Sequence, residues 1–150
     1  MPDNPEADIT QDERTMATLA HALQVVGWWI APLIIFLMQR KSRFVSFHAL
    51  QALLLQIVYM VLMGAFGLLW FAFIFLTVFQ HQADKAAPPP AMFVLFPIIW
   101  LGFMGMWVLV LVLAIVYAIK AGRGEWANYP IIGRIARSFL KMDTRTISAS

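Results

Sequence analysis

Three histidines are the first candidates for chemistry in this sequence. His21, His48 and His81 are widely spaced, and the chain contains no cysteine. Histidines without cysteine or acidic neighbours do not form a recognisable metal site. The long apolar stretches that hold them also lack aspartate and glutamate, which disfavours a carboxylate proton relay or an intramembrane di-aspartate protease. We therefore expect no metal and no cofactor.

A serine and a histidine lie close enough in the sequence to suggest a hydrolase. Ser46 and His48 are two residues apart, and on a helix such side chains point about 200° away from each other. They cannot form a catalytic pair with one another, although a partner on another helix stays open. The sequence has no Walker motif and no glycine-rich dinucleotide motif. We expect no catalytic residues and no enzyme activity. A membrane hydrolase that uses His48 or His21 stays open as a further hypothesis, besides the two non-enzymatic ones given below.

Uncharged polar residues follow two helical faces instead. They are His21 and Gln24 on one helix, and His48, Gln51, Gln56 and Tyr59 on the next. Polar groups in hydrocarbon must find partners, usually on a neighbouring helix. These residues are either hydrogen-bonded contacts that hold a helix bundle together or the lining of a polar path or binding groove.

The elements that must position these residues are transmembrane helices. Hydrophobic residues make up 61% of the 150-residue chain and charged residues 13%, against usual shares of roughly 45–50% and 25%. Three stretches, 15–39, 44–83 and 86–119, carry no charge at all. Each exceeds the roughly 20 apolar residues that cross a bilayer core of about 30 Å. The sequence therefore predicts an all-α integral membrane protein.

We expect a transmembrane domain over residues 16–121, after an acidic N-terminal tail over residues 1–15. Its three spans are expected at about 17–38, 53–79 and 92–119, with a kink or break near Pro32. Thr10 and Glu13 have the spacing of a capping box, so a helix is expected to begin there.

Residues 44–80 leave two topologies open. They can cross once, after a slanting interfacial start, or turn near Gly64 and Gly67 and cross twice. With three spans, nine Lys and Arg residues flank one face and two flank the other, whereas four spans divide them four against seven. The positive-inside rule favours three spans, with the N-terminus outside and the C-terminus in the cytoplasm. The localisation that follows is the cell inner membrane, crossed several times.

The C-terminal tail, 122–150, is expected to contain a basic amphipathic helix at about 130–141. Its apolar residues gather on one side and its basic residues on nearly the opposite side, which is typical of a helix on an anionic inner leaflet. The expected lipid-surface residues are Arg134, Arg137 and Lys141, with the rings of Trp126 and Tyr129 at headgroup level. The alternative is a helix docked on the protein's own loops.

Three motifs in order resemble a known family. They are the segment from Glu13 to His21 with Ala31–Ile35 after it, the spacing Phe44, His48, Gln51 and Gln56, and Ala118–Glu125 followed by Tyr129 and Pro130. Together they cover roughly residues 12–132 and resemble the Tic-twenty-like family, small bacterial membrane proteins grouped with a chloroplast import component and largely a domain of unknown function. Residues 60–100 look extended relative to compact members. The resemblance implies an all-helical bundle and offers protein translocation as an analogy.

Two functional hypotheses follow. The first is a non-enzymatic inner-membrane protein that serves as a subunit or scaffold of a membrane assembly. The alternative is a transport or protein-translocation component whose polar stripe lines a path. Expected partners are the bilayer with its anionic lipids, and a membrane protein or a second copy of the chain. The basic residues sit at membrane flanks, so no nucleic acid is expected.

Overall fold

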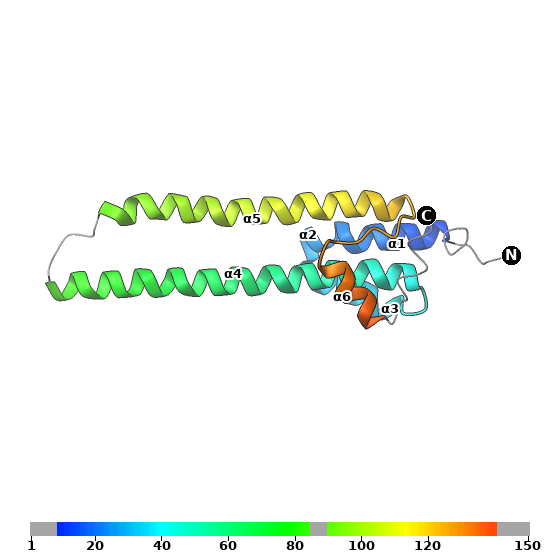
Figure 1. Ribbon diagram of the computed structural model, residues 1–150, viewed down its shortest axis with the longest axis horizontal. Helices are drawn as coiled ribbons and strands as arrows, with labels where there is room; N and C mark the ends of the chain where they lie inside the picture. Colours follow the sequence, from blue (N-terminus) through cyan, green and yellow to red (C-terminus); the bar gives the residue numbers. More distant parts are fainter. Residues whose placement is uncertain (1–8, 85–89, 141–150) are drawn as a thin grey trace. The chain divides into compact units, whose positions relative to one another are not determined.

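The computed structural model describes residues 9–84 and 90–140, and this part of the chain is helical and contains no strand (Figure 1). Its helices in chain order are α1 (Gln11–Ala22), α2 (Gln24–Gly27), α3 (Ile30–Met38), α4 (Arg43–Asp84), α5 (Pro90–Gly122) and α6 (Ile132–Phe139). The predicted all-α fold is confirmed for the residues described.

The first helix begins at the predicted capping box. The Thr10 hydroxyl accepts a hydrogen bond from the Glu13 amide at 3.2 Å, and the Glu13 carboxylate accepts one from the Thr10 amide at 2.9 Å. The same carboxylate also accepts a hydrogen bond of 2.6 Å from the hydroxyl of Ser42, just before α4. The bond from Ser42, followed by those from Thr10, holds the pKa of the Glu13 carboxyl below its usual value. Glu13 therefore ties the beginning of α1 to the beginning of α4.

The segment 17–38 does not form the single span that we expected. The chain breaks at Trp28, which has a positive φ of 51°, a conformation that bulky residues rarely adopt. Gly27 permits the turn, because a Cβ there would lie 2.7 Å from the Cβ of Ala31. Pro32 follows as the third residue of α3, where its missing amide hydrogen is not needed. The expected break is present. After it the chain reverses direction as α3, which packs beside α1, instead of continuing as one membrane-spanning helix.

The next two helices are long and uninterrupted. α4 has 42 residues and passes through Gly64 and Gly67 without a turn, and α5 has 33. At 1.5 Å per residue they measure about 63 Å and 50 Å. Within the described residues these are the two helices long and apolar enough to cross a membrane, over Arg43–Gln80 and Met92–Gly122. The three-span bundle and its orientation are not confirmed.

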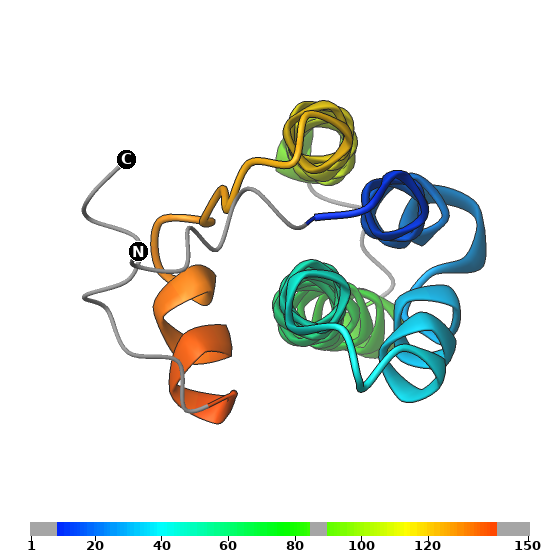
Figure 2. The ribbon, with the colours of Figure 1, turned by 90° about the vertical axis from the view of Figure 1, so that its right-hand side faces the viewer.

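The chain divides into two compact units, which we describe separately. Unit 1 comprises the chain up to Ile57 and from Leu111 onward, and unit 2 comprises Val58–Val110. In unit 1, α1 runs parallel to the first part of α4, since Glu13 meets Ser42 and the Gln24 carbonyl meets Gln56. Figure 2 views α1, α4 and α5 end-on.

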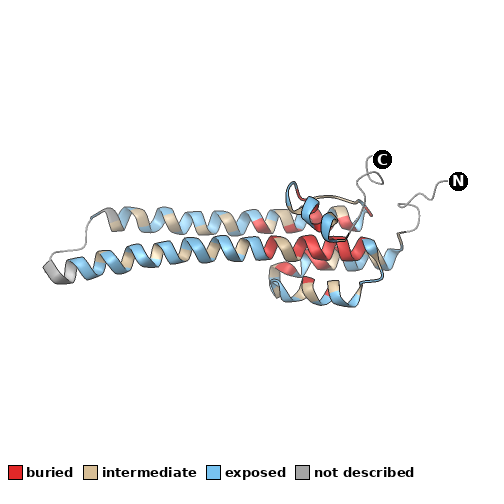
Figure 3. Ribbon diagram, turned by 60° about the horizontal axis from the view of Figure 1, so that its bottom comes forward, coloured by how far each residue is buried: buried red, intermediate tan, exposed pale blue. Residues whose placement is uncertain are grey.

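Small residues on α1 let the helices of unit 1 approach closely. Ala17 packs with Phe44 and Ala121, which places the start of α4 beside the end of α5. Ala20 packs one turn further along with Val45 of α4 and with other apolar residues. The buried part of α4 in unit 1 is visible in red in Figure 3.

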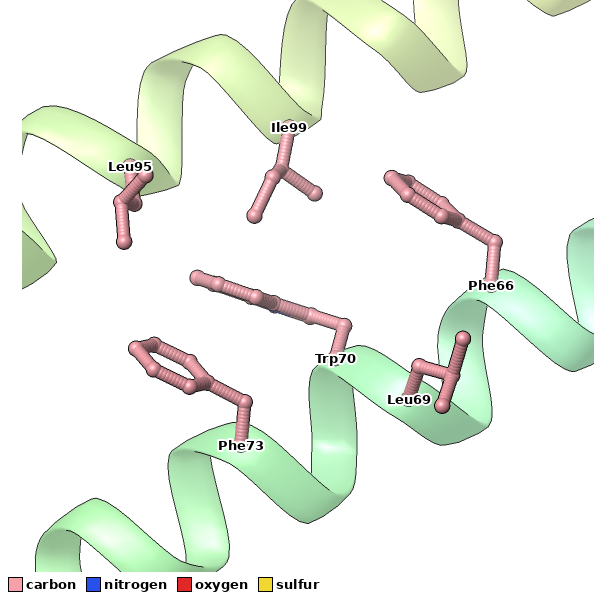
Figure 4. Close-up of a pocket in the computed structure, with 6 residues that line it drawn as sticks. All are labelled: Phe66, Leu69, Trp70, Phe73, Leu95 and Ile99. Atoms are coloured by element: carbon pink, nitrogen blue, oxygen red, sulfur yellow. The ribbon is translucent and has the colours of Figure 1, made fainter.

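Unit 2 is an antiparallel pair of apolar helices held by aromatic contacts. Phe66 of α4 meets Phe103 of α5 with ring centroids 4.8 Å apart, and Trp70 meets Phe96 at 6.3 Å. Its described side chains are exposed or half-buried, with the exception of Val110. An apolar groove lies between the helices (Figure 4), lined by Phe66, Leu69, Trp70, Phe73, Leu95 and Ile99.

Candidate functional site

Most of the predicted polar stripe is buried in unit 1, and its two histidines are linked in a series of hydrogen bonds. The Tyr129 hydroxyl lies 3.2 Å from His21 Nδ1, His21 Nε2 lies 3.1 Å from His48 Nδ1, and His48 Nε2 lies 3.0 Å from the carbonyl oxygen of Glu125. Both histidines are fully buried. This series of hydrogen bonds joins α1, α4 and the segment after α5.

The last acceptor fixes the direction of every hydrogen bond in this series. A carbonyl oxygen can only accept, so His48 carries its hydrogen on Nε2 and accepts at Nδ1. His21 must then donate from Nε2 and accept at Nδ1 from the Tyr129 hydroxyl. Burial raises the pKa of that hydroxyl, which keeps it protonated as the donor. With both rings neutral, each nitrogen atom has one partner.

Gln51 of α4 holds the same C-terminal segment with both atoms of its amide. Its Nε2 donates to the Ala127 carbonyl at 3.2 Å, and its Oε1 accepts from the Tyr129 backbone amide at 2.8 Å. Tyr117 of α5 adds a hydrogen bond of 2.6 Å from its hydroxyl to the Asn128 carbonyl. Irregular backbone in an apolar environment needs such partners. The polar side chains of α4 and α5 therefore satisfy the non-helical backbone after α5.

Gln56 and Gln24 meet at the other end of the cluster, and only one of them is satisfied. Gln56 Nε2 donates to the backbone carbonyl of Gln24 at 2.9 Å, in the last turn before the break, where helix carbonyls lose their regular partners. The side-chain amide of Gln24 is fully buried and makes no hydrogen bond. It lies near the Tyr129 hydroxyl without reaching hydrogen-bonding geometry.

Other sequence candidates lie apart from this cluster. Tyr59 is half-buried in unit 2 and makes none of these contacts. His81 lies in α4, and its side chain is outside what the structure describes. The Ser46 hydroxyl donates to the Gln39 carbonyl at 3.0 Å, whereas His48 faces His21 and Glu125. Ser46 and His48 therefore form no pair, as their spacing predicts.

Three residues expected at the lipid surface make contacts with other parts of the protein. Arg137 donates from Nε to the Asn128 side-chain oxygen at 2.8 Å, with its guanidinium 5.9 Å from the Phe47 ring centre. Trp126 packs against the rings of Phe44 and Phe47, at centroid distances of 5.2 and 5.5 Å. Tyr129 is only 2% exposed. These residues hold the C-terminal segment in place because α4 offers aromatic rings and acceptors there.

Of the remaining two, Arg134 is exposed, and Lys141 lies outside the described residues. Sequence reasoning missed Tyr117 and the carbonyl groups of Glu125, Ala127 and Asn128. Tyr117 lies eleven residues from its partner Asn128, so their contact follows from no helical spacing. Every residue has a backbone carbonyl, so no residue type identifies the three carbonyl acceptors in the sequence.

The chemistry of the cluster is that of a structural network. Within residues 9–84 and 90–140, no group of three histidine, aspartate or glutamate side chains could hold a metal ion. Four of the six stripe residues form hydrogen bonds with other parts of the same chain, namely His21, His48, Gln51 and Gln56.

Comparison with known proteins corrects the family that we inferred from sequence motifs. A profile described as the magnetosome magnetite crystal formation protein family matches residues 12–136. No curated protein and no solved structure gives a match. The matched range contains the three motifs that we compared with the Tic-twenty-like family, so that assignment is wrong and the motifs belong to different small membrane proteins. The chain belongs to the magnetosome magnetite crystal formation protein family, MamF/MmsF, a family of magnetosome membrane proteins.

Proposed function

We propose that this protein is a non-enzymatic scaffold subunit of the membrane in which magnetite crystals form. The family assignment supports the membrane and the process. The main support for a scaffold is that polar side chains of the stripe bind the protein itself. His48 and Gln51 form their hydrogen bonds with the protein's own 125–129 segment. A protein built in this way presents a fixed surface to its neighbours.

The alternative, a transport or translocation component, requires polar groups that are free to contact a solute. Among the stripe residues of unit 1, the Gln24 amide alone lacks a partner, and it is fully buried. One unpaired amide does not line a path. The scaffold is therefore the better-supported function.

Native mass spectrometry of the protein extracted from its own membranes tests the scaffold. We expect a stable complex with another membrane polypeptide or with further copies of the chain, since a scaffold acts through lasting contacts. Liposomes that contain the folded protein should show no flux of solutes or of an unfolded peptide above that of empty liposomes. A lone chain that conducts would overturn the proposal and favour the alternative.

We further propose a two-span topology with both chain ends on the cytoplasmic side. If only α4 and α5 cross, the beginning of α4 and the end of α5 share one face. Of the eleven Lys and Arg residues, only Lys85 lies in the connection between these helices. This distribution follows the positive-inside rule more closely than three spans do.

Labelling of introduced cysteines with a membrane-impermeant maleimide tests this topology, because the chain has no native cysteine. In intact cells, the Ala86→Cys variant should be labelled. The Asn4→Cys and Ser148→Cys variants should be labelled only after lysis. Labelling of Asn4→Cys in intact cells would restore the three-span arrangement and refute the two-span one.

A further inference from the structure

The short helix α6 is docked on α4 by one face only. Ala136 packs with Phe47 and Leu50 of α4. Gly133 lets α6 pack closely against the segment that precedes it, since a Cβ there would lie 2.6 Å from the Cβ of Asn128. Together with the Arg137–Asn128 hydrogen bond, these contacts fix the rotation of α6 about its axis.

A second face of α6 is apolar and is left uncovered by the residues that the structure describes. Ile131, just before the helix, and Ile135 and Phe139 within it are 72%, 44% and 71% exposed. Their spacing of four residues aligns them in one ridge. Arg134, also exposed, lies beside this ridge. We call Ile131, Ile135 and Phe139 the outer ridge.

The chain after α5 turns back along the helix that it has just left. Tyr117 stacks on Tyr129 with ring centroids 3.8 Å apart, and its hydroxyl reaches the Asn128 carbonyl. Tyr117 precedes the end of α5 at Gly122 by five residues, which is about 7.5 Å along the axis. The start of α6 is therefore held at a level inside the end of a candidate membrane-spanning helix.

The length of this helix gives the depth of that level. The apolar segment Met92–Gly122 has 31 residues, or about 46 Å, close to the roughly 40–45 Å of a bilayer with its headgroups. A point about 7.5 Å inside its end falls near the boundary between headgroups and acyl chains. Amphipathic interfacial helices bury their apolar face about 5–10 Å into this region.

We propose that α6 is an interfacial helix whose outer ridge inserts into the leaflet of a phospholipid bilayer. The ridge supplies the apolar face, and Arg134 beside it complements anionic headgroups. Arg123 lies just after α5 at the same end of unit 1, where its 70% exposed side chain is 3.9 Å from the Glu125 carboxylate. The helix is at once docked on α4 through Ala136 and inserted in lipid through the outer ridge.

Site-directed spin labelling tests this proposal on the full-length protein. We would compare Phe139→Cys, on the outer ridge, with Arg134→Cys, which is also exposed but about 140° away around the helix. Each labelled protein is reconstituted in vesicles of phosphatidylcholine with a minority of phosphatidylglycerol. Collision rates are measured with oxygen, which concentrates in the acyl region, and with a water-soluble nickel chelate.

We expect the ratio of oxygen to nickel accessibility to be several-fold higher at position 139 than at position 134. Equal ratios with high nickel accessibility would place the ridge in water and overturn the proposal. Low accessibility to both reagents at position 139 would mean that protein covers the ridge, which also overturns it. Ile135→Cys provides a second ridge position, expected to agree with position 139, in case loss of the Phe139 ring disturbs the helix.

Discussion

Replacing Gln51 with leucine is expected to lower the free energy of unfolding by about 2–5 kcal/mol, because a part-buried backbone carbonyl and a buried amide each lose their partner at about 1–3 kcal/mol. The groups are the Ala127 carbonyl and the Tyr129 amide. Equilibrium unfolding by sodium dodecyl sulfate in mixed micelles measures the change. Limited trypsin digestion should also cleave faster at Arg123, since the segment that follows it is no longer held.

Gln24→Leu is the matched control for this prediction. It makes the same exchange of a fully buried amide for an apolar side chain, but the Gln24 amide has no hydrogen-bond partner to lose. The variant should be neutral or more stable than the parent, because the cost of burying an unpaired amide is removed. Equal losses from Gln24→Leu and Gln51→Leu would show that amide burial by itself, and not the two bonds to the 127–129 segment, stabilises the fold.

A comparably large effect is expected from breaking the histidine chain. His48→Leu leaves the Glu125 carbonyl and the His21 Nε2 hydrogen without partners, at a cost of about 2–5 kcal/mol. His21→Leu leaves His48 Nδ1 and the Tyr129 hydroxyl without partners. The double variant no longer contains the two ring nitrogens that faced each other. Its loss should therefore be smaller than the sum of the single losses by about 1–2 kcal/mol.

The same micelle titration on the four proteins of this cycle measures the coupling. Tyr117→Phe serves as a control outside the histidine chain, because its hydroxyl bonds the Asn128 carbonyl instead. Additive losses from His21→Leu and His48→Leu would contradict a direct bond between the rings. Additivity would then assign the losses to packing against neighbours such as Phe44.

Local signals in the sequence predicted local structure well. The capping box placed the beginning of α1, and the proline in a long apolar stretch announced a break. The helix expected at 130–141 is present as α6. Each of these features depends on residues within one or two turns of each other, so the sequence alone contains the necessary information.

The path of the chain after the break could not be read in the same way. Residues 17–38 are long and apolar enough to span a bilayer, and apolar length does not distinguish a crossing helix from two short ones that turn back. The turn depends on Trp28 adopting a positive φ. Packing of Ala20 and Ile35 against Val45 and Ala49 of α4 accompanies the turned-back arrangement. Contacts of this kind are tertiary, and they produce no periodic pattern of residues from which the turn could be predicted.

The candidate site was predicted in its residues but not in its partners. The two helical faces group His21 with Gln24, and His48 with Gln51 and Gln56, and all five residues are buried. We expected the partners to lie on a neighbouring helix. Most partners are backbone groups of the 125–129 segment and of Gln24.

The use of backbone acceptors has a consequence for how this family can diverge. A carbonyl group is the same in every residue, so exchange of Glu125 or Ala127 for another residue leaves the bonds from His48 and Gln51 available. The donors on α4 have no such freedom, since each must supply a side-chain amide or a ring nitrogen at one position along the helix. Across relatives we therefore expect the donor positions of α4 to keep their identity, while the loop that they hold drifts in sequence and keeps its path.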